Sequence, residues 1–194
     1  QMCIRDRVHV YVPEAIRRAI RAGVKSIEHG QLIDEPTMKL IAEKGVWLSM
    51  QPFIGEGNNH YTNPVQQAKH ELVVQGTDRA YQLAKKYGVK LAWGTDLLFS
   101  PANARNQNLN IEKMTRWFSN FEILKMITHD NAELLALSGR RNPYPGKLGV
   151  IEEGALADLI VVDGNALEDI KVLTDPGKNM LLIMKDGKIY KNDL

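Results

Sequence analysis

The chain has 194 residues, of which 44% are apolar and 25% are charged, a balance typical of globular proteins. Its 25 basic and 23 acidic residues are interspersed and leave a formal charge of +2, which argues against nucleic-acid binding. No apolar run approaches the ~20 residues that span a bilayer, and the single cysteine, Cys3, excludes an internal disulfide and a thiolate zinc site. We therefore expect a soluble protein with no membrane partner, in a compartment that the sequence does not identify.

Residues 1–7 (QMCIRDR) fit no pattern downstream and resemble translated adapter sequence. We predict that they form a non-native tail and leave them out of the fold. The alternative is a short native lead-in to the first strand.

One local pattern occurs three times in the first half of the chain: a helical stretch ends at a glycine, and a valine then opens a strand. Glycine just past a helix adopts the left-handed conformation that ends it, and β-branched or aromatic residues favour extension. Each copy therefore predicts a junction from helix to strand. The copies are residues 21–27 (RAGVKSI), 43–49 (EKGVWLS) and 86–92 (KYGVKLA).

These junctions predict four strands that alternate with helices, as in a parallel sheet of βα units. Helices begin near Pro13 and Pro36, where a proline in the first turn costs no hydrogen bond, and a third covers residues 65–86. A loop rich in Gly and Asn, residues 52–64, follows the third strand, where α/β folds place binding groups. The predicted strands are residues 8–11, 24–29, 46–51 and 89–95.

The second half of the chain begins with short helices and changes at residue 140 to short strands. The predicted helices cover residues 111–118, 121–127 and 130–137, the last capped by Thr128. The predicted strands cover residues 157–163, 180–185 and 188–190, with a hairpin turn at Asp186-Gly187. We therefore predict an α/β fold with two parts, residues 8–139 and residues 140–194.

Two residues that could bind a metal ion fall at the C-terminal ends of predicted strands. His29 lies six residues after Gly23 and Asp96 lies eight after Gly88, so their parity along the strands is equal and they should face the same way. Imidazole and carboxylate at strand ends are typical of a catalytic or metal-binding mouth. Glu28 has the opposite parity and is predicted to point away. Each residue taken alone is also consistent with a structural role.

The neighbouring sequence makes the site more specific. Five stretches occur in order: residues 8–11 (VHVY) with 13–16 (PEAI), 23–30 (GVKSIEHG), 94–96 (GTD), 148–154 (LGVIEEG) with 157–162 (ADLIVV), and 185–190 (KDGKIY). Together they resemble the amidohydrolase superfamily, and within it the imidazolonepropionase-like and Xaa-Pro dipeptidase-like group. The resemblance runs from residue 8 to the end of the chain.

The resemblance implies that residues 8–139 are the C-terminal half of a (β/α)₈ TIM barrel, strands five to eight, and that residues 140–194 are part of an accessory β-sandwich. It also implies that His9, His29 and Asp96 are ligands of a divalent metal site, with Zn²⁺ the expected ion. The family's first strand carries a His-x-His pair and its fourth a lysine that bridges two metals, and neither strand is in this chain. We therefore expect a fragment that holds about half of a binuclear site and has little activity alone.

The implied activity is metal-dependent hydrolysis of an amide bond in a small molecule such as a dipeptide or an N-acyl amino acid. Metal-bound hydroxide would attack the carbonyl, and Asp96 would carry the proton to the leaving amine. Tyr11, two residues past His9, and Gln51, at the end of the third strand, are predicted substrate contacts. A cyclic-amide hydrolase of the imidazolonepropionase type and a non-catalytic barrel scaffold are the alternatives, and homo-oligomerisation is left open.

Overall fold

The computed structural model describes residues 7–55, 61–97 and 101–194. Contacts divide the chain into two compact units, Gln1–Gly94 and Thr95–Leu194. Among the helices of the described ranges, none is long and apolar enough to cross a membrane.

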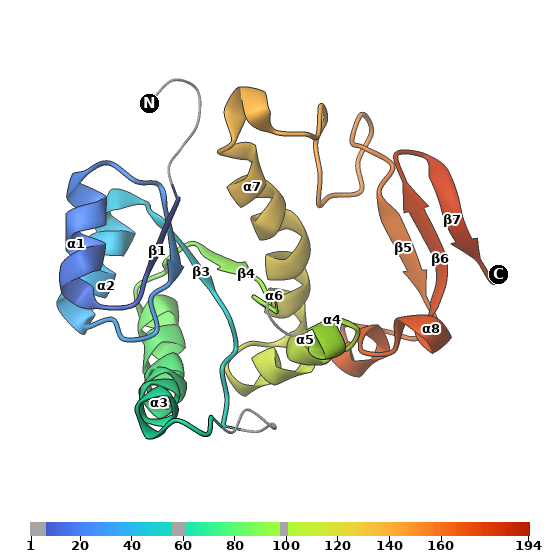
Figure 1. Cartoon of the computed structure of the whole chain (residues 1–194). Coiled ribbons are helices and arrows are strands. Elements are labelled where there is room, and N and C mark those ends of the chain that lie inside the picture. The colour runs from blue at the N-terminus through green and yellow to red at the C-terminus, as the bar shows by residue number, and fades with distance from the viewer. Residues whose placement is uncertain (1–6, 56–60, 98–100) are drawn as a thin grey trace. The chain divides into compact units, whose positions relative to one another are not determined.

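The first unit holds a four-stranded parallel sheet in the order β1-β2-β3-β4 (Figure 1). All three neighbouring pairs are parallel, as predicted from the alternation of strands and helices. The elements in chain order are β1 (Arg7–Val10), α1 (Pro13–Arg21), β2 (Ser26–His29), α2 (Glu35–Lys44), β3 (Trp47–Met50), α3 (Pro64–Lys86) and β4 (Leu91–Trp93).

Arg7 is the first residue of β1 and pairs with Ser26 of β2. Arg7 also forms an ion pair with Glu28 of β2. The predicted non-native tail was therefore one residue too long, because Arg7 is part of the sheet. Residues 1–6 of that tail lie outside the described residues.

The three predicted junctions end their helices as expected. Gly23, Gly45 and Gly88 have φ angles of 89°, 60° and 61°. In each case the glycine N–H donates to the carbonyl three residues back and the following valine N–H to the carbonyl five residues back, the paired hydrogen bonds of a Schellman motif. A Cβ at Gly45 or Gly88 would meet nothing within 4 Å, so the backbone conformation and not crowding requires glycine there.

The core of the first unit lies between the sheet and its helices. Asp34 caps α2 by accepting from the Thr37 backbone N–H at 2.9 Å, and Asn63 caps α3 by accepting from Val65 at 2.9 Å. Figure 1 shows α1 and α2 together on one side of the strands. The apolar side chains between them and the sheet are fully buried, among them Ile16, Ile27, Met38, Ile41, Leu48 and Met50.

The second unit joins short helices to a three-stranded antiparallel sheet in the order β5-β6-β7 (Figure 1). Asp186 and Gly187 turn from β6 into β7 with φ angles of 50° and 74°, the left-handed pair that a two-residue hairpin requires. Its main elements are α4 (Pro101–Ala104), α5 (Leu109–Lys113), α6 (Asn120–Lys125), the π-helical turn η2 (Met126–Asp130), α7 (Asn131–Ala136), β5 (Leu159–Val162), η4 (Ile170–Leu173), α8 (Pro176–Asn179), β6 (Met180–Lys185) and β7 (Lys188–Asn192).

The prediction that Thr128 caps a helix was wrong. The helix begins earlier, at a capping box formed by Ser119 and Glu122, and runs through η2 into α7 without a break. Thr128 lies inside this stretch, where its hydroxyl donates to the Leu124 carbonyl at 2.6 Å. A threonine can satisfy its hydroxyl in this way within a helix, so its presence alone does not mark a helix start.

Contacts place the helices of residues 101–136 in the same unit as the strands that follow, whereas the predicted division fell between residues 139 and 140. Asn108 donates to the Leu173 carbonyl at 2.9 Å, and Asn120 donates to the carbonyls of Leu167 and Glu168 at 3.1 and 3.0 Å. These amide side chains tie the helical segment to the loop between β5 and β6. In the structure α7 ends at Ala136 and the first strand of this unit, β5, begins at Leu159.

Candidate active site

One face of the first unit's sheet is polar at its C-terminal end. His9 stands opposite Glu28 in the register of β1 and β2, and Glu28 stands opposite Ser49 on β3. Directly paired residues on parallel strands point to the same side, so all three share one face. Ile27 and Leu48, of the other parity, are fully buried on the face that packs against helices. Glu28 therefore shares a face with His9 and does not point away, contrary to the prediction.

Glu28 is held on this face by Arg7 and Ser26. Arg7 donates from Nε and Nη2 to the two carboxylate oxygens at 2.8 Å each, and the Ser26 hydroxyl donates at 2.7 Å. Partial burial raises the pKa of Glu28, but the hydrogen bonds from Arg7, Ser26 and Ser49 and the charge of Arg7 outweigh it and leave the pKa lowered. Glu28 is therefore ionised and forms an ion pair with Arg7.

His29 departs from the alternation of its strand. It is the last residue of β2, and strand parity would place its side chain with Ile27, towards the helices. Its φ angle is 78°, in the left-handed region that few residues other than glycine adopt. The rotation swings the imidazole to the polar face, where its ring centre lies 4.3 Å from that of His9.

The turn at His29 depends on the glycine that follows. Gly30 is also left-handed, with φ of 74°, and a Cβ there would lie 2.8 Å from Leu48 Cδ1. The Gly30 N–H donates to the Val10 carbonyl at 2.9 Å, which keeps the turn joined to β1. The sequence His-Gly at the end of β2 is therefore the local cause of the position of the imidazole.

Gln51 fixes the orientation of the His29 ring. Its Oε1 lies 2.7 Å from His29 Nδ1 and accepts a second hydrogen bond from Gln31 Nε2 at 3.3 Å. All three side chains are at most 5% exposed. An amide oxygen can only accept, so His29 Nδ1 carries the proton, and the lone pair of the neutral ring is then on Nε2.

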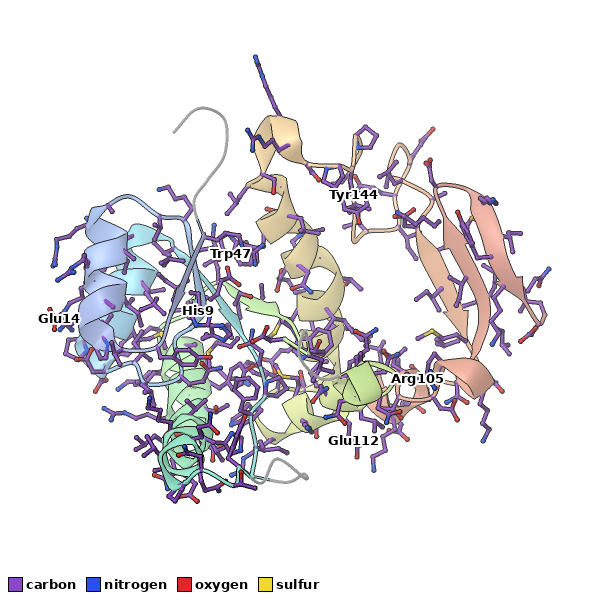
Figure 2. All side chains as sticks on the ribbon, viewed as in Figure 1. His9, Glu14, Trp47, Arg105, Glu112 and Tyr144 are labelled. Carbon is purple, nitrogen blue, oxygen red and sulfur yellow. The ribbon has the colours of Figure 1, made fainter. Side chains whose placement is uncertain are left out.

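Three aromatic rings converge on the polar face. The Tyr11 ring stacks on His29 with ring centres 4.6 Å apart and an interplanar angle of 12°, and His9 meets both rings edge-on. Figure 2 shows His9 on β1. His9, Tyr11, His29 and Gln51, four of the five predicted site residues, thus form one cluster, which we call the histidine cluster.

Asp96, the fifth predicted site residue, belongs to the second unit and follows β4 by three residues along the chain. Its side chain is exposed and its φ angle is 51°. His29 and Asp96 are therefore alike in a way that the sequence did not reveal: each follows or ends a parallel strand with a left-handed backbone.

The histidine cluster has the donors for part of a metal site. Two adjacent imidazoles, one with its Nδ1 proton held by an amide oxygen, match the way metal-binding histidines are oriented by outer partners. A catalytic zinc ion generally takes three protein ligands. Within the described ranges of the chain, no group of three or more His, Cys, Asp or Glu side chains is placed to hold a metal ion. The cluster therefore fits a divalent ion as two of its ligands.

A pocket of about 560 Å³ adjoins the histidine cluster through Tyr11, which lines both. The sequence analysis did not find it, although several of its residues recur at helical spacing on α3, a signal that was visible in the sequence. The pocket residues are Tyr11, Leu32, Phe53, Tyr61, Gln66, Lys69, His70, Leu72 and Val73.

Comparison with known proteins identifies the family. Residues 7–190 match the model of the amidohydrolase family. The chain is 33% identical over 187 residues to ochratoxinase from Aspergillus niger, and this match covers 94% of the chain and 37% of the relative.

Solved structures give the same result. A prolidase complexed with N-methylphosphonate-L-proline shares 32% identity with a TM-score of 0.81, over 96% of this chain and 45% of that one. A Xaa-Pro dipeptidase with bound methionine in its active site shares 30% identity with a TM-score of 0.78, over 96% and 44%. The chain thus spans less than half the length of these relatives. With the family model matched over nearly all of its residues, the chain belongs to the amidohydrolase family.

Proposed function

We propose that the protein to which this chain belongs is a metal-dependent hydrolase of amide bonds in small substrates such as dipeptides or N-acyl amino acids. In this proposal the chain supplies strands five to eight of a (β/α)₈ barrel, with β1 to β4 in those positions, followed by part of a β-sandwich. The observation that carries the proposal is the adjacent imidazoles of His9 and His29, with His29 Nδ1 hydrogen-bonded to Gln51 Oε1.

The roles of the residues follow from their geometry and chemistry. His9 and His29 would hold a divalent ion, with Zn²⁺ the expected one. His29 would bind it through Nε2, because its Nδ1–H donates a hydrogen bond to Gln51 Oε1. Such an ion, when bound, lowers the pKa of water towards ~7 and polarises an amide carbonyl. A second ion would need ligands from outside this chain.

Asp96 is the proposed general base and acid. A carboxylate at the end of a strand can accept a proton from the attacking water and pass it to the leaving amine. Tyr11, half-buried between the cluster and the pocket, is the proposed substrate contact. Gln51 was predicted to touch the substrate, and its buried bond to His29 supports a positioning role in its place.

The names of the relatives support a substrate with a single amide bond, since two of the matched structures are a prolidase and a Xaa-Pro dipeptidase. A small molecule is the proposed partner, in preference to nucleic acid or a membrane, because the small net charge of +2 gives no basic field.

The proposal is tested on the complete protein with Asp96→Asn. Asparagine tolerates the left-handed backbone as aspartate does, so the variant removes the charge and spares the turn. We expect stoichiometric metal by elemental analysis, partly kept in the variant, and loss of dipeptide hydrolysis by 10²-fold or more, of the order that general acid–base catalysis contributes.

Asp186→Asn is the matched control, because Asp186 is also a left-handed aspartate but lies in the β6–β7 turn. It should keep full activity. Full activity in Asp96→Asn would refute the role of Asp96. A complete reading frame without a His-x-His pair on its first strand and a lysine on its fourth would refute the catalytic proposal.

A further inference from the structure

The pocket beside Tyr11 has two chemically different ends. Its residues on α3 include Gln66, Lys69, His70 and Val73, at positions i, i+3, i+4 and i+7, which lie on one face of a helix. The polar members come first along the helix and the apolar ones, with Leu72, come later. At 1.5 Å per residue the two ends are separated by roughly 6 Å along the helix axis.

The apolar residues of the lining come from three segments. Leu32 comes from the loop after β2, Phe53 from the loop after β3, and Leu72 and Val73 from α3. The Tyr61 ring tilts against His70 with ring centres 5.4 Å apart. The volume of about 560 Å³ lies within the range of about 300–1,000 Å³ usual for pockets that hold small organic ligands.

The polar end carries a positive charge that is not neutralised within the described residues. Lys69 forms no ion pair with a described carboxylate. The nearest acidic residue in sequence, Glu71, does not line the pocket and accepts a hydrogen bond from Gln67 Nε2 at 2.9 Å. An anion is therefore the complementary group for this end, and a carboxylate is the anion that small amide substrates carry.

Tyr11 connects the pocket to the proposed chemistry, because its ring lines the pocket and stacks on His29 at 4.6 Å. We propose that this pocket binds the amino-acid part of an N-acyl amino acid with a large apolar side chain. Phe53, Leu72 and Val73 contact the apolar side chain, and Lys69 binds the carboxylate. The inference rests on the proposed function and narrows its substrate class to N-acylated apolar amino acids with a free carboxylate.

The test is direct binding to the complete protein, freed of metal with a chelator and assayed without turnover. The probes are N-acetyl-L-phenylalanine, N-acetyl-L-phenylalaninamide, which lacks the carboxylate, and N-acetylglycine, which lacks the apolar side chain. Isothermal titration calorimetry or ligand-observed NMR gives each affinity. We expect the first probe to bind best, roughly threefold to fivefold better than the amide, as one partly exposed ion pair predicts.

Two variants assign the ends of the pocket. Lys69→Gln should lower the affinity for N-acetyl-L-phenylalanine to that of the amide and leave the amide unchanged, and the control Lys44→Gln, an exposed lysine in the last turn of α2, should change neither. Phe53→Ala should weaken both phenylalanine probes alike. Circular dichroism verifies that each variant is folded, and Lys69 is exposed, so its loss should not affect folding.

Equal binding of the acid and the amide would overturn the proposal, as would an equal effect of Lys69→Gln on both. Absence of binding to the folded protein would also overturn it. The binding assay needs no metal, so it tests the pocket separately from the proposed hydrolysis. If only the proposed hydrolysis is wrong, the complete protein will be inactive but its pocket will still bind the probe.

Discussion

Two residues of the candidate site, His29 and Asp96, have left-handed backbones. Among the described residues, the non-glycine positions with positive φ are His29, Asp96 and Asp186. The last is explained by its hairpin turn. A left-handed conformation costs a residue with a side chain roughly 1–2 kcal/mol, so it persists where the surroundings impose it, and such positions cluster at functional sites. Two of the three, His29 and Asp96, are residues that the sequence analysis proposed for the site.

The amide of Gln51 is predicted to control the tautomer of His29. Gln51→Leu would remove the buried acceptor that Gln51 Oε1 provides to His29 Nδ1 and to Gln31 Nε2, which should lower the free energy of unfolding by about 1–3 kcal/mol. Denaturant unfolding measures this loss. Long-range ¹H–¹⁵N NMR should show His29 protonated at Nδ1 in the parent chain and at Nε2 in the variant.

Gln51→Glu is the control, because it keeps an acceptor at the same place and should keep the Nδ1-protonated form. If His29 has the same tautomer in the parent and in Gln51→Leu, the amide does not position the ring.

Sequence reasoning proposed the residues of the candidate site but not their orientation. Parity along the strand, which assumes a regular backbone, placed Glu28 on the wrong face and could not show that φ of 78° moves His29 to the face of His9. Gln51 was found from its position at a strand end, and its partner Gln31, in a loop, gave no signal. The helical spacing of the pocket residues on α3 was visible in the sequence, but how α3 packs against the loops after β2 and β3 is contained in no local pattern.

At the scale of elements, α3 approaches the loop after β2 through a glycine. A Cβ at Gly76 would lie 2.3 Å from the Gln31 carbonyl oxygen, much closer than a non-bonded carbon and oxygen can approach. Alanine in the middle of a helix normally stabilises it by about 0.5–1 kcal/mol relative to glycine. Here we predict the opposite sign, with Gly76→Ala lowering the free energy of unfolding by about 1–3 kcal/mol, the usual cost of overpacking.

Chemical denaturation measures the effect, and Gln75→Ala, an exposed neighbour on the same helix, is the control that should change stability by less than about 0.5 kcal/mol. Because Gln31 is hydrogen-bonded to Gln51, the NMR signals of His29 should also shift in Gly76→Ala and not in Gln75→Ala. A stabilised Gly76→Ala would show that the two segments are farther apart than described.

Glu35, at the start of α2, links that helix to the end of α3. It accepts hydrogen bonds from Lys86 Nζ at 2.7 Å and from the Tyr87 hydroxyl. The hydrogen bonds from Lys86 and Tyr87 and the charge of Lys86 lower the pKa of Glu35 to about 2. A lowered pKa stabilises the fold above the unfolded value near 4.5, and this stabilisation is lost as the pH falls from there through about 2.

We therefore predict that Glu35→Gln melts at a lower temperature than the parent at pH 7 and that the difference shrinks steadily below pH 4.5. Thermal melts across pH 2–7 measure it, and the effect is small because the carboxylate is solvent-exposed. Glu14→Gln, at an exposed ion pair with Arg18 on α1, is the control. A difference that does not depend on pH would exclude the ion pair as its cause.

The elements themselves were the most predictable part of the fold. The three glycine junctions were identified correctly because the Schellman motif is local and requires a left-handed residue. The antiparallel hairpin at Asp186-Gly187 was predicted for the same reason. The continuity of α6, η2 and α7 was missed because Thr128 resembled a cap in sequence, whereas its hydroxyl bonds back to Leu124 in the structure.

At the scale of the whole molecule, the parallel sheet has two open edges among the described strands. In the order β1-β2-β3-β4, β1 and β4 each pair on one side only, and unpaired strand edges are templates for association with another chain. Several apolar side chains of the same unit are also exposed, among them Val12, Val65 and Leu72 at 46%, 62% and 55%. The formal charge of +2 supplies little repulsion between molecules.

We therefore predict that the 194-residue chain self-associates without a fixed stoichiometry. Sedimentation velocity at increasing concentration should show a weight-average mass that rises continuously, because strand edges have no symmetry that closes an assembly. A longer protein that supplies strands on the far side of β1 and β4 should sediment as a defined species under the same conditions. A chain that stays monomeric at every concentration would mean that its edges are already protected, and its fold would then be self-sufficient without further strands.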